Sequence, residues 1–219
     1  MRKAVLVVLC LAFVAAFAGC HINKGVKGSG NRKAEKRSLP AFSAVETTGV
    51  YQAEIICQQP ASFEIETDDN ILPLIKTDVR DGVLYVSSEG RINPSKGVQL
   101  RISVPELASV ASRGAGDINV QDSNADDLKI DSTGAASIKA TGKAKMATIS
   151  STGAGDIDTS RLRSEKARVT VTGAASVTVY ASEQLDVSVS GVGSVDYLGN
   201  PKSVNKSVSG IGSVNKKGD

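Results

Sequence analysis

Six segments in the second half of the chain share one pattern, in which a glycine is followed four positions later by Ile or Val. They read ASRGAGDINV (111–120), DSTGAASIKA (131–140), SSTGAGDIDT (150–159), TVTGAASVTV (170–179), SVSGVGSVDY (188–197) and SVSGIGSVNK (207–216). Their first glycines are Gly114, Gly134, Gly153, Gly173, Gly191 and Gly210, at steps of 20, 19, 20, 18 and 19 residues. Internal repetition at such a period is typical of solenoid proteins.

The stretches between these segments alternate apolar and polar residues. This pattern of period two, seen at 128–130, 167–171 and 185–189, indicates half-buried strands. A unit of about 20 residues cannot bury its apolar face alone, whereas units stacked about 4.8 Å apart share hydrogen bonds and a continuous core. We therefore predict an all-β protein, a right-handed parallel β-helix (β-solenoid) of about six coils of 19 or 20 residues.

Stacking the coils places equivalent residues in columns. Four residues after each first glycine, the column is entirely β-branched: Ile118, Ile138, Ile157, Val177, Val195 and Val214. Four residues before it, the column reads Val110, Ile130, Ile149, Val169, Val187 and Lys206. Because a charge in the core column opposes growth of the sheet beyond the last coil, we interpret Lys206 as protection of the terminal edge.

Two further columns carry small residues. Two positions before each glycine the column reads Ser112, Ser132, Ser151, Val171, Val189 and Val208, and we expect the serines to hydrogen-bond along the stack. The glycine column itself indicates a corner with positive φ or with close backbone approach, where a Cβ atom is costly.

Residues 38–105 are less repetitive but rich in β pattern. We expect strands at 42–46, 50–57, 62–67, 82–87 and 98–104, which begin the solenoid and close its N-terminal end. Asp68-Asp69-Asn70 can cap a short helix over Ile71–Val79, with Pro73 in its first turn. We thus divide the folded part, 38–219, into an N-terminal block at 38–105 and repeat coils at 106–219.

The N-terminus has the features of an export signal. Arg2 and Lys3 precede an apolar run at 4–19, which is shorter than the roughly 20 residues of a membrane span. The run ends in Phe17-Ala18-Gly19-Cys20, which resembles a bacterial lipobox, although Phe17 stands where Leu, Val or Ile is usual. The sequence predicts a lipoprotein signal peptide at 1–19 and acyl chains such as palmitate on Cys20. An ordinary signal peptide and an uncleaved anchor are the alternatives.

The predicted anchor and the charge distribution limit the possible partners. Acyl chains on Cys20 would hold the mature protein at a membrane, and the absence of Asp at position 21 resembles the outer-membrane default. We interpret 20–37 as the lipidated Cys and a flexible basic tether, of which 21–37 carries a charge of +5. Subtracting this and +2 for Arg2 and Lys3 from the total of +3 leaves −4 for 38–219. A mildly acidic body with few aromatic residues argues against nucleic-acid binding.

Most catalytic machinery is excluded by composition. His21 is the only histidine, and the cysteines are Cys10, Cys20 and Cys57. A Ser-His-Asp triad, a Cys-His pair and a His- or Cys-rich zinc site therefore lack parts. We predict no cofactor, and we interpret Cys57 as a small strand residue without a disulfide partner.

An acidic row is the remaining candidate for catalysis. Three residues after each first glycine stand Asp117, Ser137, Asp156, Ser176, Ser194 and Ser213. Asp117 and Asp156, two coils apart, should have backbones about 9.6 Å from each other, near the upper limit of roughly 9.5 Å for an inverting glycosidase pair. The alternative is that Asp and Ser cap backbone groups at corners. We therefore assign no catalytic residue.

No metal site is assigned either. Asp156 and Asp158 share a strand face, but the nine-residue Gly-Asp period of calcium-binding β-rolls is absent. An outward row of mixed charge is interpreted as solvated rather than selective. It comprises Asn119, Lys139, Asp158, Thr178, Asp196 and Asn215.

Short motifs across residues 28–214 resemble the head GIN domain family, whose members are described as autotransporter adhesins. They are Gly28-Ser29-Gly30-Asn31, Phe42-Ser-Ala-Val45, Gly49-Val50-Tyr51, Phe63-Glu-Ile65, Asp69-Asn70-Ile71-Leu72, Asp81-Gly82-Val83-Leu84 and the repeated Gly-x-Gly-[Ser/Asp]-[Ile/Val]. The resemblance implies a right-handed β-helix exported to the cell envelope. It supplies no catalytic residues.

Three functions follow as hypotheses. The first is an outer-membrane lipoprotein whose β-helix is a non-catalytic binding or adhesion surface for a glycan or a protein. The second is a structural envelope scaffold without a dedicated ligand. The third is a polysaccharide-active enzyme that uses Asp117 and Asp156.

Overall fold

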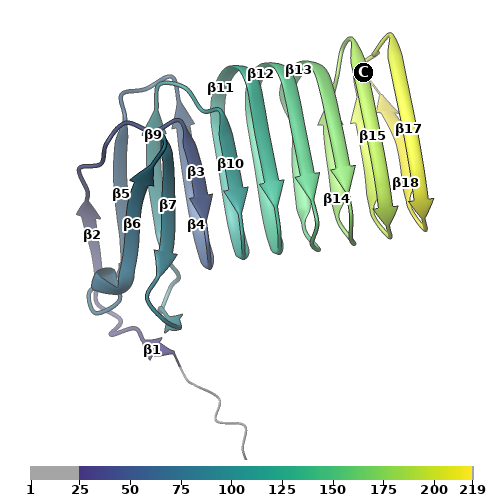
Figure 1. Cartoon of the computed structure of the whole chain (residues 1–219). Coiled ribbons are helices and arrows are strands. Elements are labelled where there is room, and N and C mark those ends of the chain that lie inside the picture. Colours follow the sequence, from purple (N-terminus) through teal and green to yellow (C-terminus); the bar gives the residue numbers. More distant parts are fainter. Residues whose placement is uncertain (1–24, 219) are drawn as a thin grey trace, which may run out of the picture.

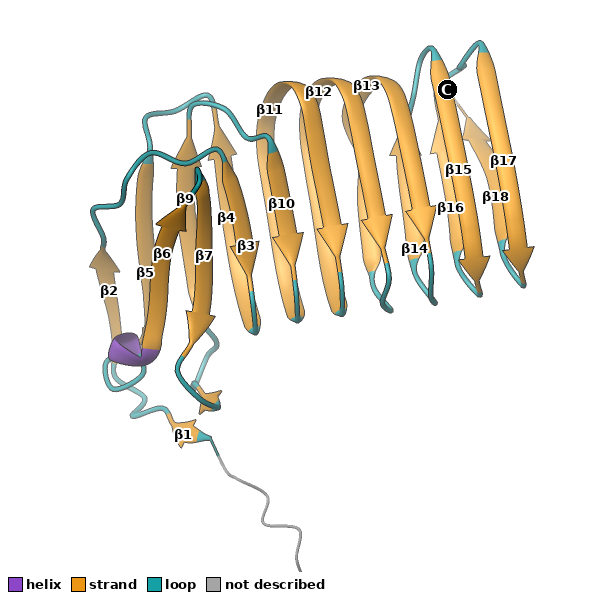
Figure 2. Cartoon of the chain, viewed as in Figure 1, coloured by secondary structure: helices purple, strands orange, loops and turns teal. Residues whose placement is uncertain are grey.

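A computed structural model describes residues 25–218 as a two-sheeted β-solenoid (Figures 1 and 2). The predicted signal peptide at 1–19 and Cys20 lie outside the described residues. In the front sheet of Figure 1 the order is β6 (Ile75–Arg80), β7 (Val83–Ser88), β3 (Ala44–Thr47), β10 (Ser109–Ser112), the second parts of β11 (Ala115–Ser132), β12 (Ala135–Ser151) and β13 (Asp156–Val171), β15 (Gln184–Gly191) and β17 (Ser203–Gly210).

The back sheet closes each coil on the opposite side. Its order is β2 (Arg32–Lys36), β5 (Ser62–Asp68), β9 (Gln99–Val104), β4 (Val50–Cys57), the first parts of β11, β12 and β13, β14 (Ser176–Tyr180), β16 (Ser194–Leu198) and β18 (Ser213–Gly218). Coil-to-coil pairing from β10 to β18 is parallel. The predicted all-β solenoid is therefore confirmed.

The predicted columns stand in register inside the stack. In the front sheet, each residue of the first column is the register partner of the next one: Val110, Ile130, Ile149, Val169, Val187 and Lys206. In the back sheet, the second column pairs in the same way: Ile118, Ile138, Ile157, Val177, Val195 and Val214. Every aliphatic member is buried except Val214, which is half-buried in the last coil. The two columns face each other as the core between the sheets.

Close backbone approach explains the glycine column. A Cβ atom added at Gly134 would overlap the carbonyl oxygen of Gly114, and the same relation links each later repeat glycine to the one before it. Gly114 in turn lies against Gly49, a seventh member that the sequence pattern did not reveal. Among the six predicted repeat glycines only Gly191 and Gly210 have positive φ. The shared requirement is therefore space for the neighbouring carbonyl.

The serine column differs from the expectation. The buried hydroxyls of Ser132 and Ser151 have no hydrogen-bond partner within residues 25–218. Because the two residues pair in register, their backbones lie about one strand spacing, 4.8 Å, apart, which exceeds hydrogen-bonding distance for like rotamers. The serines pack as small core residues instead.

The N-terminal block supplies the expected strands, all within two residues of the predicted bounds. Their order in space differs from their order in the chain: β3 and β4 lie between β7 and β9 on one side and β10 and β11 on the other. The pairs β2–β5, β5–β9 and β6–β7 are antiparallel, and they close the N-terminal end.

The predicted helix over Ile71–Val79 is wrong. A single 3-10 turn, η1 (Leu72–Leu74), is followed by strand β6, which pairs with β7 across a turn at Asp81–Gly82. Both turn residues have positive φ, as a tight hairpin turn requires. Pairing with β7 satisfies the backbone groups of 75–80 without a helix. Within residues 25–218 no helix has the length and apolarity to cross a membrane.

The expected flexible tether does not extend over residues 25–37. β1 (Val26–Lys27) pairs with β8 (Ile92–Asn93), and β2 pairs with β5. The guanidinium of Arg32 donates to Glu66 Oε1 at 3.0 Å and to the Gly97 carbonyl at 3.1 Å. Local sequence shows no strand periodicity here because neither β1 nor β2 has a buried residue, so no apolar face alternates with a polar one.

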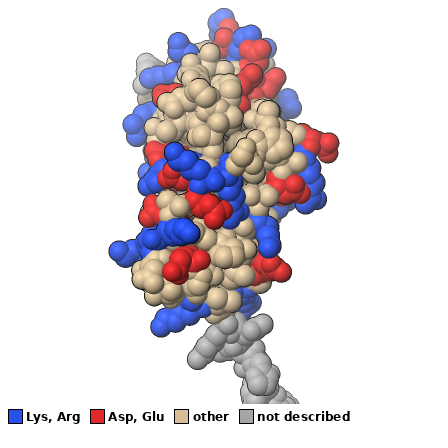
Figure 3. All heavy atoms as spheres, turned by 90° about the vertical axis from the view of Figure 1, so that its left-hand side faces the viewer, with Lys and Arg blue, Asp and Glu red and all other residues tan. Residues whose placement is uncertain are grey.

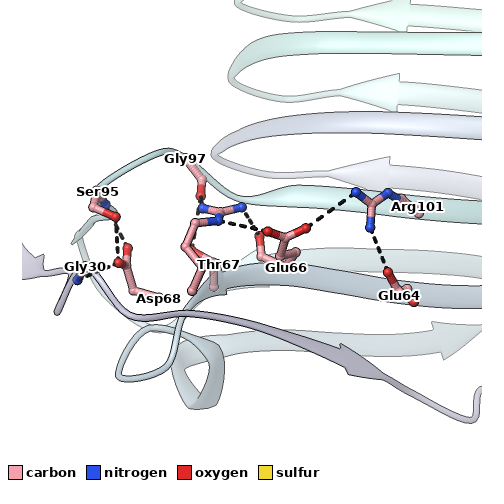
Figure 4. Close-up of polar contacts among 9 residues, drawn as sticks. Gly30, Glu64, Glu66, Thr67, Asp68, Ser95, Gly97 and Arg101 are labelled. Carbon is pink, nitrogen blue, oxygen red and sulfur yellow. Dashed lines mark hydrogen bonds and ion pairs between the residues drawn. The ribbon is translucent and has the colours of Figure 1, made fainter.

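Asp68 connects this segment to the solenoid (Figure 4). Its buried carboxylate accepts hydrogen bonds from the Gly30 N–H at 2.8 Å, the Ser95 N–H at 2.7 Å and the Ser95 hydroxyl at 2.6 Å. A Cβ atom at Gly28 would overlap this carboxylate, and Gly30 has a φ of +89°. These contacts account for both glycines of the Gly28-Ser29-Gly30 motif.

The glycine corners yield a stability prediction. Gly153→Ala should lower the free energy of unfolding by about 2 kcal/mol or more, because the new methyl group must displace the Gly134 carbonyl. Ala154→Ser, at the next and exposed position, is the matched control and should change it by less than about 0.5 kcal/mol. Denaturant titration measures both, and equal losses would contradict the corner packing.

A second prediction concerns pH. The hydrogen bonds from the Ser95 hydroxyl and N–H, and then from Gly30, hold the pKa of Asp68 below its ordinary value. A carboxyl whose folded-state pKa is depressed stabilises the fold above its unfolded pKa of about 3.9, and this contribution is lost as pH falls through the folded value. Asp68→Asn, whose amide would face an N–H donor, should therefore lower the denaturant midpoint at pH 7. The difference from the unmodified protein should shrink below about pH 4; a difference independent of pH would contradict this role.

Candidate functional site: a polar groove across the back sheet

Two polar hollows adjoin on the outer face of the back sheet. The first, of about 300 Å³, is lined by side chains including Gln52, Glu54, Gln99, Arg101, Asp117 and Asn119. The second, of about 330 Å³, is lined by side chains including Asn119, Gln121, Lys139, Thr141, Asp158 and Arg161. Asn119 belongs to both, so the hollows adjoin across the coils, and we refer to the two together as the polar groove.

Strand register positions the central row of this polar groove. The row takes one residue from each of the neighbouring strands β9, β4, β11, β12 and β13, and each residue is the register partner of the next. These residues are Arg101, Glu54, Asn119, Lys139 and Asp158. Four strand spacings separate the first from the last, which gives the polar groove a length of about 19 Å. The side chains project outward because the alternate residues of each strand fill the core.

Two strand irregularities coincide with the second hollow. The register of β11 against β12 shifts between Val120 and Ser123, and that of β12 against β13 shifts between Lys139 and Thr141. Such bulges bend a strand and redirect its side chains. Arg161, three residues after Asp158, is exposed although regular alternation would turn it inward, and it lines the hollow together with Thr141.

Charges along the polar groove are partly paired. Arg101 contacts Glu64 at 2.8 Å and Glu66 at 3.4 Å, as Figure 4 shows. The Gln121 amide donates to Glu54 Oε1 at 2.9 Å. Lys139 and Arg161 form no ion pair within residues 25–218, although the charges of both act on Asp158.

Asp158 is held in its charged form. Partial burial raises the pKa of Asp158, but hydrogen bonds from Ser160 and the nearby charges of Arg161 and Lys139 together outweigh it, and the pKa lies below its ordinary value. The Ser160 N–H donates to Asp158 Oδ1 at 3.0 Å. Asp158 is thus an acceptor between two cations.

The structure places the candidate acidic row in register. Asp117, Ser137 and Asp156 pair in sequence, and both carboxylates are exposed. Asp117 lines the first hollow, whereas Asp156 lines neither. Within residues 25–218 no group of three or more His, Cys, Asp or Glu side chains is placed to hold a metal ion.

Cys57 is a buried, free thiol on β4. Burial, with a smaller contribution from the charge of Asp122, raises the pKa of the Cys57 thiol to about 11. The thiol is therefore protonated at neutral pH, which makes it a poor nucleophile.

Sequence reasoning found only part of the polar groove. The outward row of mixed charge contains Asn119, Lys139 and Asp158, which the sequence led us to interpret as solvated rather than selective. Gln52, Glu54, Gln99 and Arg101 were missed because they come from the N-terminal block, which lacks the repeat. Once β4 is paired to β11, the alternation of 50–57 identifies Gln52 and Glu54 as outward-facing.

The sequence and fold of this chain are similar to those of known proteins. The family model described as "Putative auto-transporter adhesin, head GIN domain" matches residues 41–201. This chain belongs to the head GIN domain family. The match spans both the N-terminal block and most coils of this head GIN protein, as the motifs had indicated.

Solved structures of low sequence identity share the head GIN fold. A putative adhesin from Bacteroides fragilis is 22% identical, with a TM-score of 0.73, and the similarity covers 88% of this chain and 100% of that one. A putative lipid binding protein from Parabacteroides distasonis is 18% identical, with a TM-score of 0.54 and coverage of 89% and 100%. No curated protein matched the sequence.

Proposed function

We propose that this head GIN protein is an outer-membrane lipoprotein, anchored through Cys20, whose solenoid is a non-catalytic binding surface. The observation that carries the proposal is the polar groove. It presents amides, a hydroxyl, carboxylates and two cations without an intramolecular ion pair on rigid strands. A parallel sheet fixes the backbone beneath these side chains, so no backbone segment has to be ordered when a ligand binds, which favours affinity.

A glycan is the ligand class that suits the polar groove best. Hydroxyl-rich polymers offer donors and acceptors at short intervals, and the groove offers both along about 19 Å. Lys139 and Arg161, which form no ion pair within residues 25–218, can each donate to a carboxylate or sulfate group on such a glycan. The description of the family as adhesins agrees with a binding role.

Two alternatives have less support. A glycosidase needs a general acid, commonly held in apolar surroundings, and Asp117 and Asp156 are both exposed. A scaffold without a ligand leaves the polar groove and its strand bulges without a role.

Binding is tested with acidic and neutral polysaccharide matrices. Residues 20–219 with Cys20→Ala should be retained on an acidic glycan, and Lys139→Ala with Arg161→Ala should weaken retention about tenfold or more because both unpaired cations are lost. Lys143→Ala with Lys166→Ala, two exposed cations outside the groove, is the matched control and should change little. Turnover that disappears in Asp117→Asn with Asp156→Asn would establish the enzyme instead. Absence of both retention and turnover across the panel would favour the scaffold.

The anchor is tested separately. Cys20→Ala in the full chain should abolish acyl labelling and move the protein from the membrane fraction to a soluble or uncleaved form, because no thiol remains at the lipobox position. Cys57→Ala is the control and should leave labelling and fractionation unchanged. Acyl labelling that persists in Cys20→Ala would refute the assignment.

A further inference from the structure

An apolar cleft lies at the lower N-terminal end of the solenoid in Figure 1. The β1–β8 ribbon lies beside the corner at Gly49–Val50, and together they enclose about 770 Å³. Val50 and Val26 are 68% and 46% exposed, and Ile92 and Pro94 are half-buried in the same region. A rigid corner therefore presents apolar side chains to the outside.

Unpaired cations surround this apolar cleft. Lys27 and Arg91 line it, and Lys96 lies on the adjacent loop; all three are exposed. None of them forms an ion pair with another residue within 25–218. Figure 3 views this end directly and shows Lys and Arg side chains around its lower part, with Asp and Glu side chains among them.

The neighbouring carboxylates are already engaged. Glu89 pairs with Lys76 at 2.8 Å. Asp68 is buried under Ser95, and Asp69 accepts a hydrogen bond from the Ser29 hydroxyl. Hydrogen bonds from neutral donors do not cancel a carboxylate charge, so Asp68 and Asp69 offset part of the charge of the three cations, which still leave a positive excess at this end.

Chain length limits how far this end can lie from a bilayer. Only residues 21–24 separate Cys20 from Gly25. At no more than about 3.6 Å per residue, the five steps from Cys20 to Gly25 span at most about 18 Å. If Cys20 is acylated as proposed above, the apolar cleft and its cations stay close to the membrane surface.

We propose that this end of the solenoid docks directly on an anionic phospholipid surface. Lys27, Arg91 and Lys96 contact the headgroups, while Val26 and Val50 enter the interfacial layer. Each basic residue near an anionic surface strengthens membrane partitioning about fivefold. The docking adds a second membrane contact to the lipid, and two contacts hold a protein at a bilayer more firmly than one.

Vesicle co-flotation tests the docking without the lipid. Residues 20–219 with Cys20→Ala should float with phosphatidylcholine vesicles that contain phosphatidylglycerol, and far less with phosphatidylcholine alone. Arg91→Glu with Lys96→Glu should reduce the partition coefficient at least tenfold. Lys143→Glu with Lys166→Glu changes the net charge equally, at exposed positions on β12 and β13, and should have less than a threefold effect.

The outcomes separate this proposal from the anchor. Equal flotation with neutral and anionic vesicles would overturn it, because the binding would then not depend on anionic lipid. Equal losses in the two charge-reversal variants would also overturn it, because the cations at this end would then contribute no more than cations elsewhere. Val50→Ser should lower the partition coefficient without changing its dependence on anionic lipid. Since the tested chain carries no acyl group, failure of Cys20 acylation is detected by labelling alone.

Discussion

The approach of one backbone to the next at the glycine corners governs this structure. From Gly114 onward, each repeat glycine lies against the carbonyl oxygen of the glycine one coil earlier, and the residue after it donates its N–H to that same oxygen. A side chain there would push the coils apart at the corner while the strands on either side require a spacing of about 4.8 Å. Because Gly49 begins this series, the N-terminal block shares the register of the coils.

The two ends of the stack solve the problem of exposed strand edges differently. At the N-terminal end, antiparallel strands turn the chain back on itself, and β2 is tied in by Arg32 and the buried Asp68 carboxylate. At the C-terminal end the core column finishes in Lys206, whose ammonium lies 4.8 Å from the Tyr197 ring centroid and donates to the Val214 carbonyl. A charge at this position keeps the last coil soluble and discourages further pairing.

Core and surface positions are under different constraints in a β-solenoid. Inward positions are constrained by stacking, so they repeat, whereas outward positions are free to differ between coils. The polar groove arises where the non-repeating N-terminal block meets the first coils and where strand bulges interrupt the register. Its chemistry therefore depends on residues such as Arg101 and Lys139, which come from parts of the chain with unrelated sequence patterns.

The sequence alone determined the all-β class, the solenoid, the core columns and the corner positions of the repeat glycines, because each depends on a local pattern repeated at a fixed period. Only the tertiary structure decided that 75–80 forms a strand rather than a helix, that 32–36 pairs with β5, and that β3 and β4 lie between strands that follow them in the chain. In these segments the backbone partner is distant in sequence and unrelated to any repeat. The polar groove could not be read from the sequence for a related reason, because β4 and β9 of the N-terminal block reach the coils only through strand partners that are distant in the chain.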